Sequence, residues 1–236
     1  MPPPGRRRHD ASHASQAGHG PRNGGGPSPE AAGDDATATS PPRIIGGSLG
    51  GRRLEFSPDP RTRPMKERVR EALFNLLGYT VEGAIVLDLF AGTGALGFEA
   101  VSRGAAAAWF GERHFPTADV LRRSAKALEV EDRVTIRPGD VLLWARRLPP
   151  IPRTSPWIAF VSPPWEMFTT HADELLALVS VVIAAAPPGS QIVVEAEMSF
   201  DPALLPEPEA WTPRPIPPAL LLFREIGSVG AALADE

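Results

Sequence analysis

Apolar residues along this chain come in short continuous runs, separated by longer stretches with helical periodicity. Short apolar runs bounded by turn residues are typical of strands buried on both faces, and apolar positions three and four residues apart are typical of helices. Strands are predicted at residues 84–89, 107–111, 134–137, 157–161 and 191–196, and helices at 95–103, 116–128, 141–147 and 172–185. This alternation predicts an α/β fold in which helices cover both faces of a largely parallel sheet.

The segments on either side of this region have different patterns. Residues 43–56, RIIGGSLGGRRLEF, predict a β-hairpin, because two short runs flank a glycine-rich turn. A helix is predicted to follow, with Pro64 in its first turn and Gly78 at its end. Seven Pro among residues 201–218 predict an irregular crossing before a last strand at 220–224.

Composition sets the first 42 residues apart from the rest of the 236-residue chain. They contain eight Pro and seven Gly and no aromatic residue, Ile, Leu or Val, so a disordered tail is predicted for residues 1–42. A basic hairpin–helix extension is predicted for residues 43–78. The alternating strands and helices then form a domain at residues 79–236.

Charge is distributed unevenly, although the net charge of the chain is only −4. Residues 43–70 carry eight basic and three acidic side chains, whereas residues 71–236 carry 12 basic and 21 acidic ones. A basic segment on an acidic body favours a polyanionic partner such as nucleic acid, and the alternative is a solvated helix face with ion pairs. Arg63, Lys66 and Arg70 are expected to share one available face of the helix. The candidate nucleic-acid contacts are Arg43, Arg52, Arg53, Arg63, Lys66 and Arg70.

Several classes of protein are excluded by composition. The chain has no Cys, which excludes disulfide scaffolds, thiolate catalysis and Cys-based zinc sites. Its five His show no ligand spacing, so no metal site is predicted. No apolar run reaches the ~18–20 residues that cross a bilayer, and we expect a cytoplasmic protein without a membrane span. No pattern indicates oligomerisation, so a monomer is expected.

Chemistry-bearing residues are expected just after each strand, because ligands of such sheets bind beyond the carboxyl ends of the strands. The first strand leads into DLFAGTGALG, residues 88–97. Gly92 and Gly94 lack Cβ atoms where the backbone must approach a ligand, and the following helix offers unpaired N–H groups. A dinucleotide site shares this pattern. Glu112, after the second strand, can accept hydrogen bonds from both hydroxyls of a ribose, which NAD and S-adenosylmethionine both contain.

Two further carboxylates favour S-adenosylmethionine over NAD. Asp140, after the third strand, can accept from an adenine amino group, although a helix N-cap is the alternative interpretation. Asp88 can act through water or backbone near a cationic aminoacyl end. The candidate cofactor-binding residues are Asp88, Phe90, Ala91, Gly92, Thr93, Gly94, Glu112 and Asp140.

The fourth strand leads into the candidate catalytic residues Ser162, Pro163, Pro164 and Trp165. Two consecutive Pro stiffen the backbone and aim a carbonyl in one direction. An aromatic ring directly after them gives a base a face on which to stack, worth ~1–3 kcal/mol. Acceptors that orient an amine, together with a ring that holds a base, are what amino-group methylation requires. The alternative is a structural turn that ends in a buried Trp.

Four segments carry a resemblance to a known family: Arg43-Ile-Ile-Gly-Gly, Arg63-Pro64, Arg68-Val-Arg-Glu-Ala-Leu-Phe-Asn75 and Asp88-Leu-Phe-Ala-Gly-Thr-Gly-Ala-Leu-Gly97-Phe-Glu-Ala. They resemble the bacterial small-subunit ribosomal RNA guanine-N2 methyltransferases of the D type, over about residues 43–225. The resemblance implies a class I S-adenosylmethionine-dependent methyltransferase fold with a seven-stranded sheet, and an N-terminal extension that helps to hold RNA. It also implies methylation of a guanine N2 in an assembled or assembling small ribosomal subunit.

The chain departs from the family pattern at two places. Members normally carry Asp or Asn where this chain has Ser162, and relatives often have hydroxyl residues where it has Met65 and Lys66. Serine at the first position also occurs in cytosine-N4 methyltransferases of DNA. The expected mechanism is a displacement in which Ser162 Oγ and the Pro163 carbonyl orient the amine, while Trp165 stacks on a flipped base. The alternatives are a DNA amino-methyltransferase, an NAD-dependent oxidoreductase and a non-catalytic RNA-binding relative.

Overall fold

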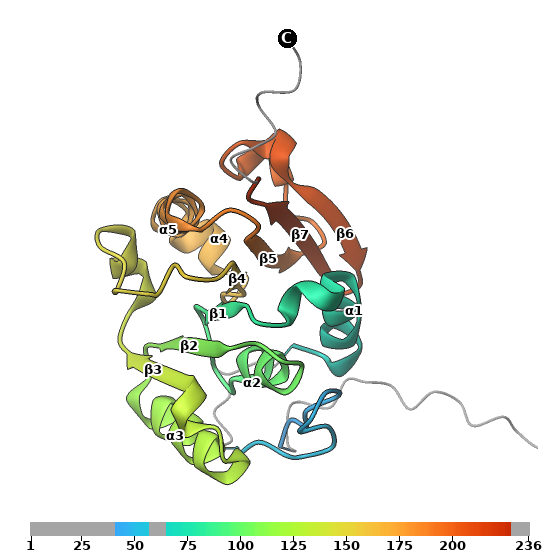
Figure 1. The fold of residues 1–236 in the computed structure, drawn as a ribbon. Helices are drawn as coiled ribbons and strands as arrows, with labels where there is room; N and C mark the ends of the chain where they lie inside the picture. Colours follow the sequence, from blue (N-terminus) through green and yellow to red (C-terminus); the bar gives the residue numbers. More distant parts are fainter. Residues whose placement is uncertain (1–40, 57–64, 228–236) are drawn as a thin grey trace, which may run out of the picture. The chain divides into compact units, whose positions relative to one another are not determined.

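The computed structural model describes residues 41–56 and 65–227 (Figure 1). The predicted tail therefore lies outside the described residues except for its last two positions, and Arg63 also lies outside them. Seven strands form one sheet in the order β3-β2-β1-β4-β5-β7-β6. Their bounds are β1 Ile85–Asp88, β2 Ala107–Glu112, β3 Val134–Pro138, β4 Trp157–Val161, β5 Gln191–Glu197, β6 Thr212–Ile216 and β7 Ala219–Glu225.

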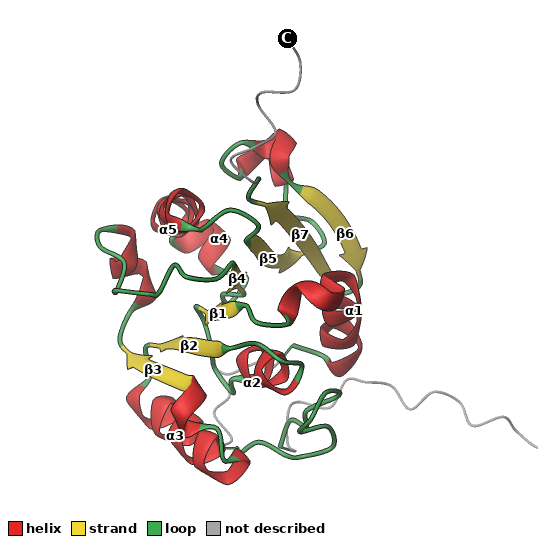
Figure 2. Ribbon diagram, viewed as in Figure 1, coloured by secondary structure: helices red, strands yellow, loops and turns green. Residues whose placement is uncertain are grey.

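The first five strands run parallel to one another, whereas β7 is antiparallel to β5 and β6 is antiparallel to β7. One face of the sheet is covered by α1 (Glu67–Leu77), α2 (Ala95–Ser102) and α3 (Phe115–Leu128). The other face is covered by α5 (Ala172–Ala185), the short α4 (Met167–Thr170) and the 3-10 segment η3 (Val141–Ala145), as Figure 2 shows. Helices on both faces explain why β1 and β4 are buried at every residue. The expected α/β fold is confirmed.

Three elements differ from the expectations. β6 lies where an irregular crossing was predicted, and it contains two Pro because it is the edge strand, where a missing N–H breaks no ladder bond. The expected hairpin at 43–56 is reduced to a single antiparallel bridge between Arg43 and Arg53. The α-helix expected at 141–147 is instead the 3-10 segment η3. The other 3-10 segments of the described residues are η1 Gly78–Val81, η2 Glu131–Arg133, η4 Pro202–Leu204 and η5 Pro208–Ala210.

The N-terminal segment, residues 41–56, is attached to the body through one buried carboxylate. Glu99 of α2 is fully buried and accepts hydrogen bonds from the backbone N–H groups of Ile45 (2.7 Å) and Gly46 (2.9 Å). Arg103 Nε donates to the same carboxylate at 2.7 Å. Arg70 of α1 pairs with Glu99 at 3.8 Å, so this residue joins the segment, α1 and α2.

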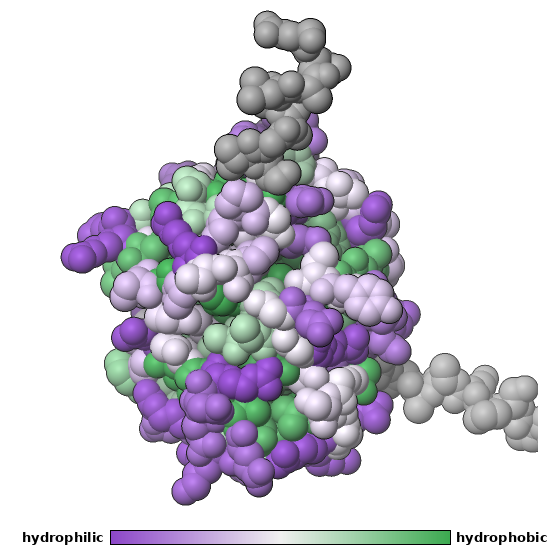
Figure 3. Space-filling view, viewed as in Figure 1, coloured by the Kyte–Doolittle hydropathy of each residue, from purple (hydrophilic) through white to green (hydrophobic). Residues whose placement is uncertain are grey.

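Apolar packing supports the same attachment. Ile44 and Leu54 of the N-terminal segment lie in one core with the apolar residues of α1 and with the face of the sheet that α1 covers. The apolar face of α1 thus docks on the body, whereas the domain boundaries stay a prediction. Among residues 41–56 and 65–227, no helix is both long and apolar enough to cross a membrane. Figure 3 shows hydrophilic residues gathered over the α3 end of the face it draws.

Candidate active site at the switch between β1 and β4

The carboxyl ends of the parallel strands meet at one edge of the sheet, where the strand order reverses between β1 and β4. A sheet of this kind leaves a crevice for ligands at that point. Asp88 ends β1, Glu112 ends β2, and Asp140 and Ser162 follow β3 and β4. The topology therefore places these four candidate residues at the same edge, which we call the site edge.

The loop between β1 and α2 has the conformation that its glycines allow. Gly92 and Gly94 have φ angles of 50° and 75°, in the left-handed region that favours glycine. A Cβ on Gly94 would lie 2.6 Å from Leu121 Cδ2 and 2.7 Å from Phe98 Cε2, so a larger residue would displace the core. Because α2 begins at the next residue, its unpaired N–H groups face the loop. The other loop candidates are Phe90, which is partly exposed, and the buried Ala91 and Thr93.

Glu112 holds this loop against the end of β2. Its Oε2 accepts a hydrogen bond from Gly92 N–H at 2.9 Å, and its Oε1 accepts one from His114 N–H at 2.7 Å. The side chain is partly exposed, and each carboxylate oxygen has a second lone pair. The carboxylate is thus fixed by two backbone donors and can still accept from a ligand.

Asp88 is buried, with 1% of its surface exposed. Its Oδ2 accepts a hydrogen bond from Gly97 N–H at 3.0 Å, which ties β1 to the first turn of α2. Burial raises the pKa of this carboxyl from 3.8 to about 7, the Gly97 bond opposes the change, and the charge of Glu112 adds to it. A cation bound at the loop would therefore stabilise the ionised form of Asp88.

Asp140 is exposed and acts as an N-cap. Its Oδ1 accepts from Leu142 N–H at 2.9 Å at the start of η3. The N-cap interpretation is confirmed, and the remaining lone pairs of the carboxylate leave it able to accept from a ligand as well.

The residues after β4 form a stiff turn that leads into α4. The carbonyls of Pro164 and Trp165 accept from Met167 N–H (2.9 Å) and Phe168 N–H (3.1 Å). No described donor reaches the Pro163 carbonyl. Pro163 itself is buried, Pro164 is exposed, and Trp165 is partly buried against the core under α1. The Pro163 carbonyl and the Trp165 ring are therefore the groups at the end of β4 that a ligand could use.

Sequence reasoning missed a fifth acidic or polar residue of the site edge, Glu195 of β5. The Ser162 hydroxyl donates a hydrogen bond to Glu195 Oε2. Val161 is opposite Val194 in the parallel ladder, so one further step sets Ser162 beside Glu195. Burial raises the pKa of Glu195, and the bond from Ser162 opposes the change. The feature of the sequence that could have revealed Glu195 is a carboxylate within the apolar run of the strand, IVVEAE.

A family model described as Conserved hypothetical protein 95 matches residues 42–212 of the chain. The chain belongs to this family. A relative from Escherichia coli (strain K12), named ribosomal RNA small subunit methyltransferase D, is 37% identical over 123 residues, which are 52% of this chain and 60% of that protein. A relative of the same name from Haemophilus influenzae is 40% identical over 87 residues, 37% of this chain and 45% of that protein. The chain thus spans about half the length of the curated relatives it matches, and the resemblance found in the sequence is confirmed.

Solved structures of related proteins share the fold of the family. A candidate methyltransferase from Escherichia coli has a TM-score of 0.63 and 28% identity, and the match covers 80% of this chain and all of that one. A candidate methylase from Haemophilus influenzae has a TM-score of 0.61 and 26% identity over the same shares. The sheet order with antiparallel β7 and these matches establish the class I methyltransferase fold.

The basic residues expected to bind nucleic acid do not form one exposed face in this family member. Arg70 is 1% exposed and donates to the Arg43 carbonyl at 2.6 Å, so its expected place on an available face of α1 is wrong. The helical pattern could not reveal that Glu99, from another helix, draws this guanidinium into the core.

The four other candidates that the structure describes differ in how far their side chains are engaged. Arg43 pairs with Glu67 at 2.9 Å on the surface. Arg52 donates to the carbonyls of Ala127 and Leu128, at the C-terminal end of α3. The exposed side chains that remain from the candidate set are those of Arg53 and Lys66.

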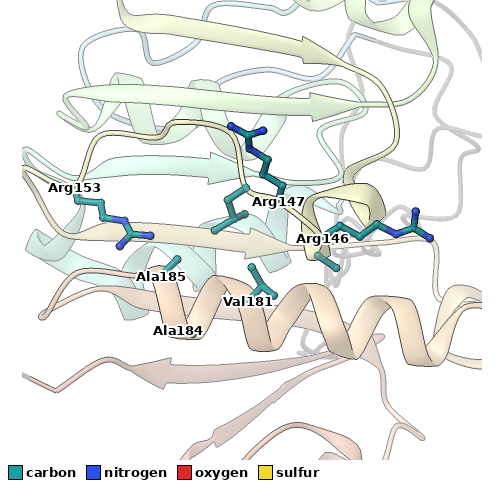
Figure 4. Close-up of a pocket in the computed structure, with 8 residues that line it drawn as sticks. Arg146, Arg147, Arg153, Val181, Ala184 and Ala185 are labelled. Atoms are coloured by element: carbon teal, nitrogen blue, oxygen red, sulfur yellow. The ribbon is translucent and has the colours of Figure 1, made fainter.

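A hollow of about 450 Å³ lies away from the site edge, between the chain after η3 and the C-terminal half of α5 (Figure 4). Arg146, Arg147 and Arg153 line it together with Val181 and Ala185. Figure 4 shows the three guanidinium groups pointing in different directions. Because they do not converge on one point, the hollow lacks the geometry of an anion site.

Proposed function

We propose that this protein transfers a methyl group from S-adenosylmethionine to an exocyclic amine of a base in small-subunit ribosomal RNA, namely guanine N2. The observation that carries this proposal is the Ser162–Trp165 turn, which places a hydroxyl, an unoccupied carbonyl and an aromatic ring at the site edge beside the glycine loop. The name of the Escherichia coli relative supports RNA of the small subunit as the substrate.

The acceptor groups at the site edge fit S-adenosylmethionine. Asp88, Glu112 and Asp140 are carboxylates, and S-adenosylmethionine offers them a cationic aminoacyl group, two ribose hydroxyls and an adenine amino group. NAD would satisfy Glu112 through its ribose in the same way, but it would leave the Ser162–Trp165 turn without a role. Glu112 would hold the ribose, Asp140 the adenine and the loop at Gly92 the aminoacyl part near Asp88. When bound, this cofactor supplies a methyl group on a cationic sulfur.

The chain's own residues then position the acceptor of that methyl group. Ser162 Oγ and the Pro163 carbonyl accept hydrogen bonds from the two N–H groups of the amine, which aims the nitrogen lone pair away from them. Trp165 stacks on the base after it leaves its helix. Orientation of this kind supplies most of the acceleration in a displacement that needs little acid or base help.

RNA would reach the site edge past the start of α1. Arg68 donates to the carbonyl of Pro217, in the turn between β6 and β7. That turn lies at the carboxyl end of β5, because Ala219 is opposite Glu197 in the ladder. Lys66, two residues before Arg68 and exposed, therefore lies at the site edge and is the first candidate for a phosphate contact.

The test is transfer of labelled methyl from S-adenosylmethionine to small ribosomal subunits that lack base methylations, beside naked ribosomal RNA and duplex DNA. The modified nucleoside is then identified. N2-methylguanine formed in the subunit supports the proposal in full. Label in duplex DNA would contradict the substrate, and cofactor binding without label on any substrate would contradict the activity.

A further inference from the structure

The hydrogen bond between Ser162 and Glu195 has no role in the reaction as described so far. Glu195 is 9% exposed, and the hydroxyl of Ser162 donates to its Oε2. The two residues come from neighbouring strands, so the backbone ladder between Val161 and Val194 fixes their separation. Burial of a carboxylate is costly unless donors satisfy it. The hydrogen bond between Ser162 and Glu195 is therefore unlike an incidental contact on the surface.

The surroundings of Glu195 leave Ser162 as its polar neighbour. On one side, the residue of β7 opposite Glu195 is Leu221. On the other side, Val161 at the end of β4 is opposite Val194, so the next residue, Ser162, lies beside Glu195. The charged side chain buried under α1, Arg70, is engaged by Glu99 and the Arg43 carbonyl. No ion pair of Glu195 occurs among residues 41–56 and 65–227.

A serine hydroxyl is ambiguous as a recognition group, because it has one donor and two lone pairs. At Ser162 the hydroxyl donates its hydrogen bond to the carboxylate of Glu195, so the lone pairs of the hydroxyl oxygen remain for a ligand. The Pro163 carbonyl is also an acceptor and has no described donor. The end of β4 thus presents acceptors, and an atom that binds there must carry hydrogen atoms.

We infer that Glu195 is a positioning residue that turns Ser162 into a hydrogen-bond acceptor, so that the site selects an amino group over a ring nitrogen or carbonyl oxygen of a base. This inference rests on the proposed function. Ser162 has no carboxylate or amide with which to orient an amine. In this inference Glu195 orients the Ser162 hydroxyl, and the hydroxyl oxygen then orients the amine.

The kinetic experiment compares four variants with the wild type in methyl transfer to small subunits. Glu195→Leu removes the acceptor for the serine proton without burying a new polar group, and we expect kcat to fall ~10-fold or more with the KM for S-adenosylmethionine unchanged. Glu195→Gln keeps an oxygen that accepts this proton, so kcat should recover to within about threefold of the wild type. Ser162→Ala should lower kcat as Glu195→Leu does. The double variant Ser162→Ala/Glu195→Leu should be no slower than the slower single variant, because both residues act through one hydrogen bond.

Glu197→Gln is the matched control, since Glu197 is an exposed carboxylate two residues further along β5. It should leave kcat unchanged. If losses of Glu195→Leu and Ser162→Ala add in the double variant, or if Glu195→Gln is as slow as Glu195→Leu, the positioning role is overturned. Thermal unfolding of each variant shows whether a loss of kcat follows a loss of fold.

A second measurement does not depend on methyl transfer. The carboxyl carbon of Glu195 is titrated by NMR in the wild type, in Ser162→Ala and in Glu197→Gln. The donor removed in Ser162→Ala lowers the pKa of Glu195 in the wild type, so the pKa should move further up in that variant and not in the control. An unmoved pKa overturns the pairing. A moved pKa in a protein that methylates none of the substrates supports the pairing and contradicts the proposed function.

Discussion

Glu99 and Asp88 are both buried carboxylates, but they differ in how many donors surround them. Glu99 accepts from the backbone of Ile45 and Gly46 and from Arg103, and it also pairs with Arg70. Asp88 has a single described donor, the N–H of Gly97, and its pKa is raised to about 7 by burial. Burial is thus compensated at Glu99 and left largely uncompensated at Asp88.

The difference separates a structural role from a functional one. A carboxylate with several donors gains enough from them to be retained in the core, and it holds residues 41–56 and α1 on the body. A buried carboxylate with few donors is costly, and such groups cluster where a ligand later supplies the missing interaction. Glu195, with Ser162 as its donor, belongs to the second kind.

The largest effect is expected from Glu99→Gln. The substitution keeps the shape of the side chain but leaves Arg70 buried without an opposite charge, which typically costs about 3–5 kcal/mol. The free energy of unfolding, measured in urea, should fall by that amount. The matched control is Glu67→Gln, because Glu67 pairs with Arg43 on the surface, where solvent screens the two charges and loss of the pair should change stability little. Equal losses in the two variants would contradict a special role for Glu99.

Ser162→Ala is expected to act on rate and not on stability. Loss of one oriented acceptor should lower kcat about 10- to 100-fold and leave the affinity for S-adenosylmethionine within twofold, as measured by calorimetry. Ser180→Ala is the control, since Ser180 lies exposed on α5 and its hydroxyl donates to the Leu176 carbonyl. An unchanged kcat in Ser162→Ala would remove this residue from the mechanism.

Asp88→Asn should change the pH dependence of stability. The carboxyl of Asp88 has a pKa of about 7 in the folded protein and 3.8 as its ordinary value, so the folded state binds the extra proton between these values. Stability of the wild type therefore falls as pH rises from about 4 to about 7, by about 1.4 kcal/mol for each unit of pKa shift. The variant lacks this ionisation, and its stability relative to the wild type should rise over the same interval. Parallel stability curves from pH 4 to 8 would show that Asp88 has an ordinary pKa.

Much of the fold follows from local pattern, because the central strands β1 and β4 are buried on both faces. The bounds predicted for β4 and α5 agree with the structure, and the Gly92–Gly94 loop is where the glycines require it. β6 was missed because Pro213 and Pro215 argue against a strand unless it is known to be at an edge. Edge position is a property of the whole sheet, which local pattern does not contain.

The site could be predicted where each residue follows a strand, and not where two strands must be in register. Asp88, Glu112, Asp140 and Ser162 were placed correctly at the site edge by this rule. Glu195 was missed because its contact with Ser162 depends on the pairing of β4 with β5.

The smallest expected effects concern RNA binding, where Lys66 and Arg53 are both exposed but belong to different segments of the chain. Lys66 lies two residues before Arg68, whose side chain donates to the β6–β7 turn. Arg53 lies in the N-terminal segment, where it is bridged to Arg43, and its neighbour Arg52 bonds the last carbonyls of α3.

Lys66→Ala should therefore weaken binding of small-subunit RNA about two- to threefold, and it should lower the slope of log K against log salt by about 0.7–0.9, the loss of one phosphate contact. Arg53→Ala should leave both quantities unchanged. Retention of labelled RNA on the protein at several salt concentrations measures both. A loss in Arg53→Ala equal to that in Lys66→Ala would mean that RNA also contacts the N-terminal segment, and that the segment held by Glu99 is part of the substrate-binding surface as well as the fold.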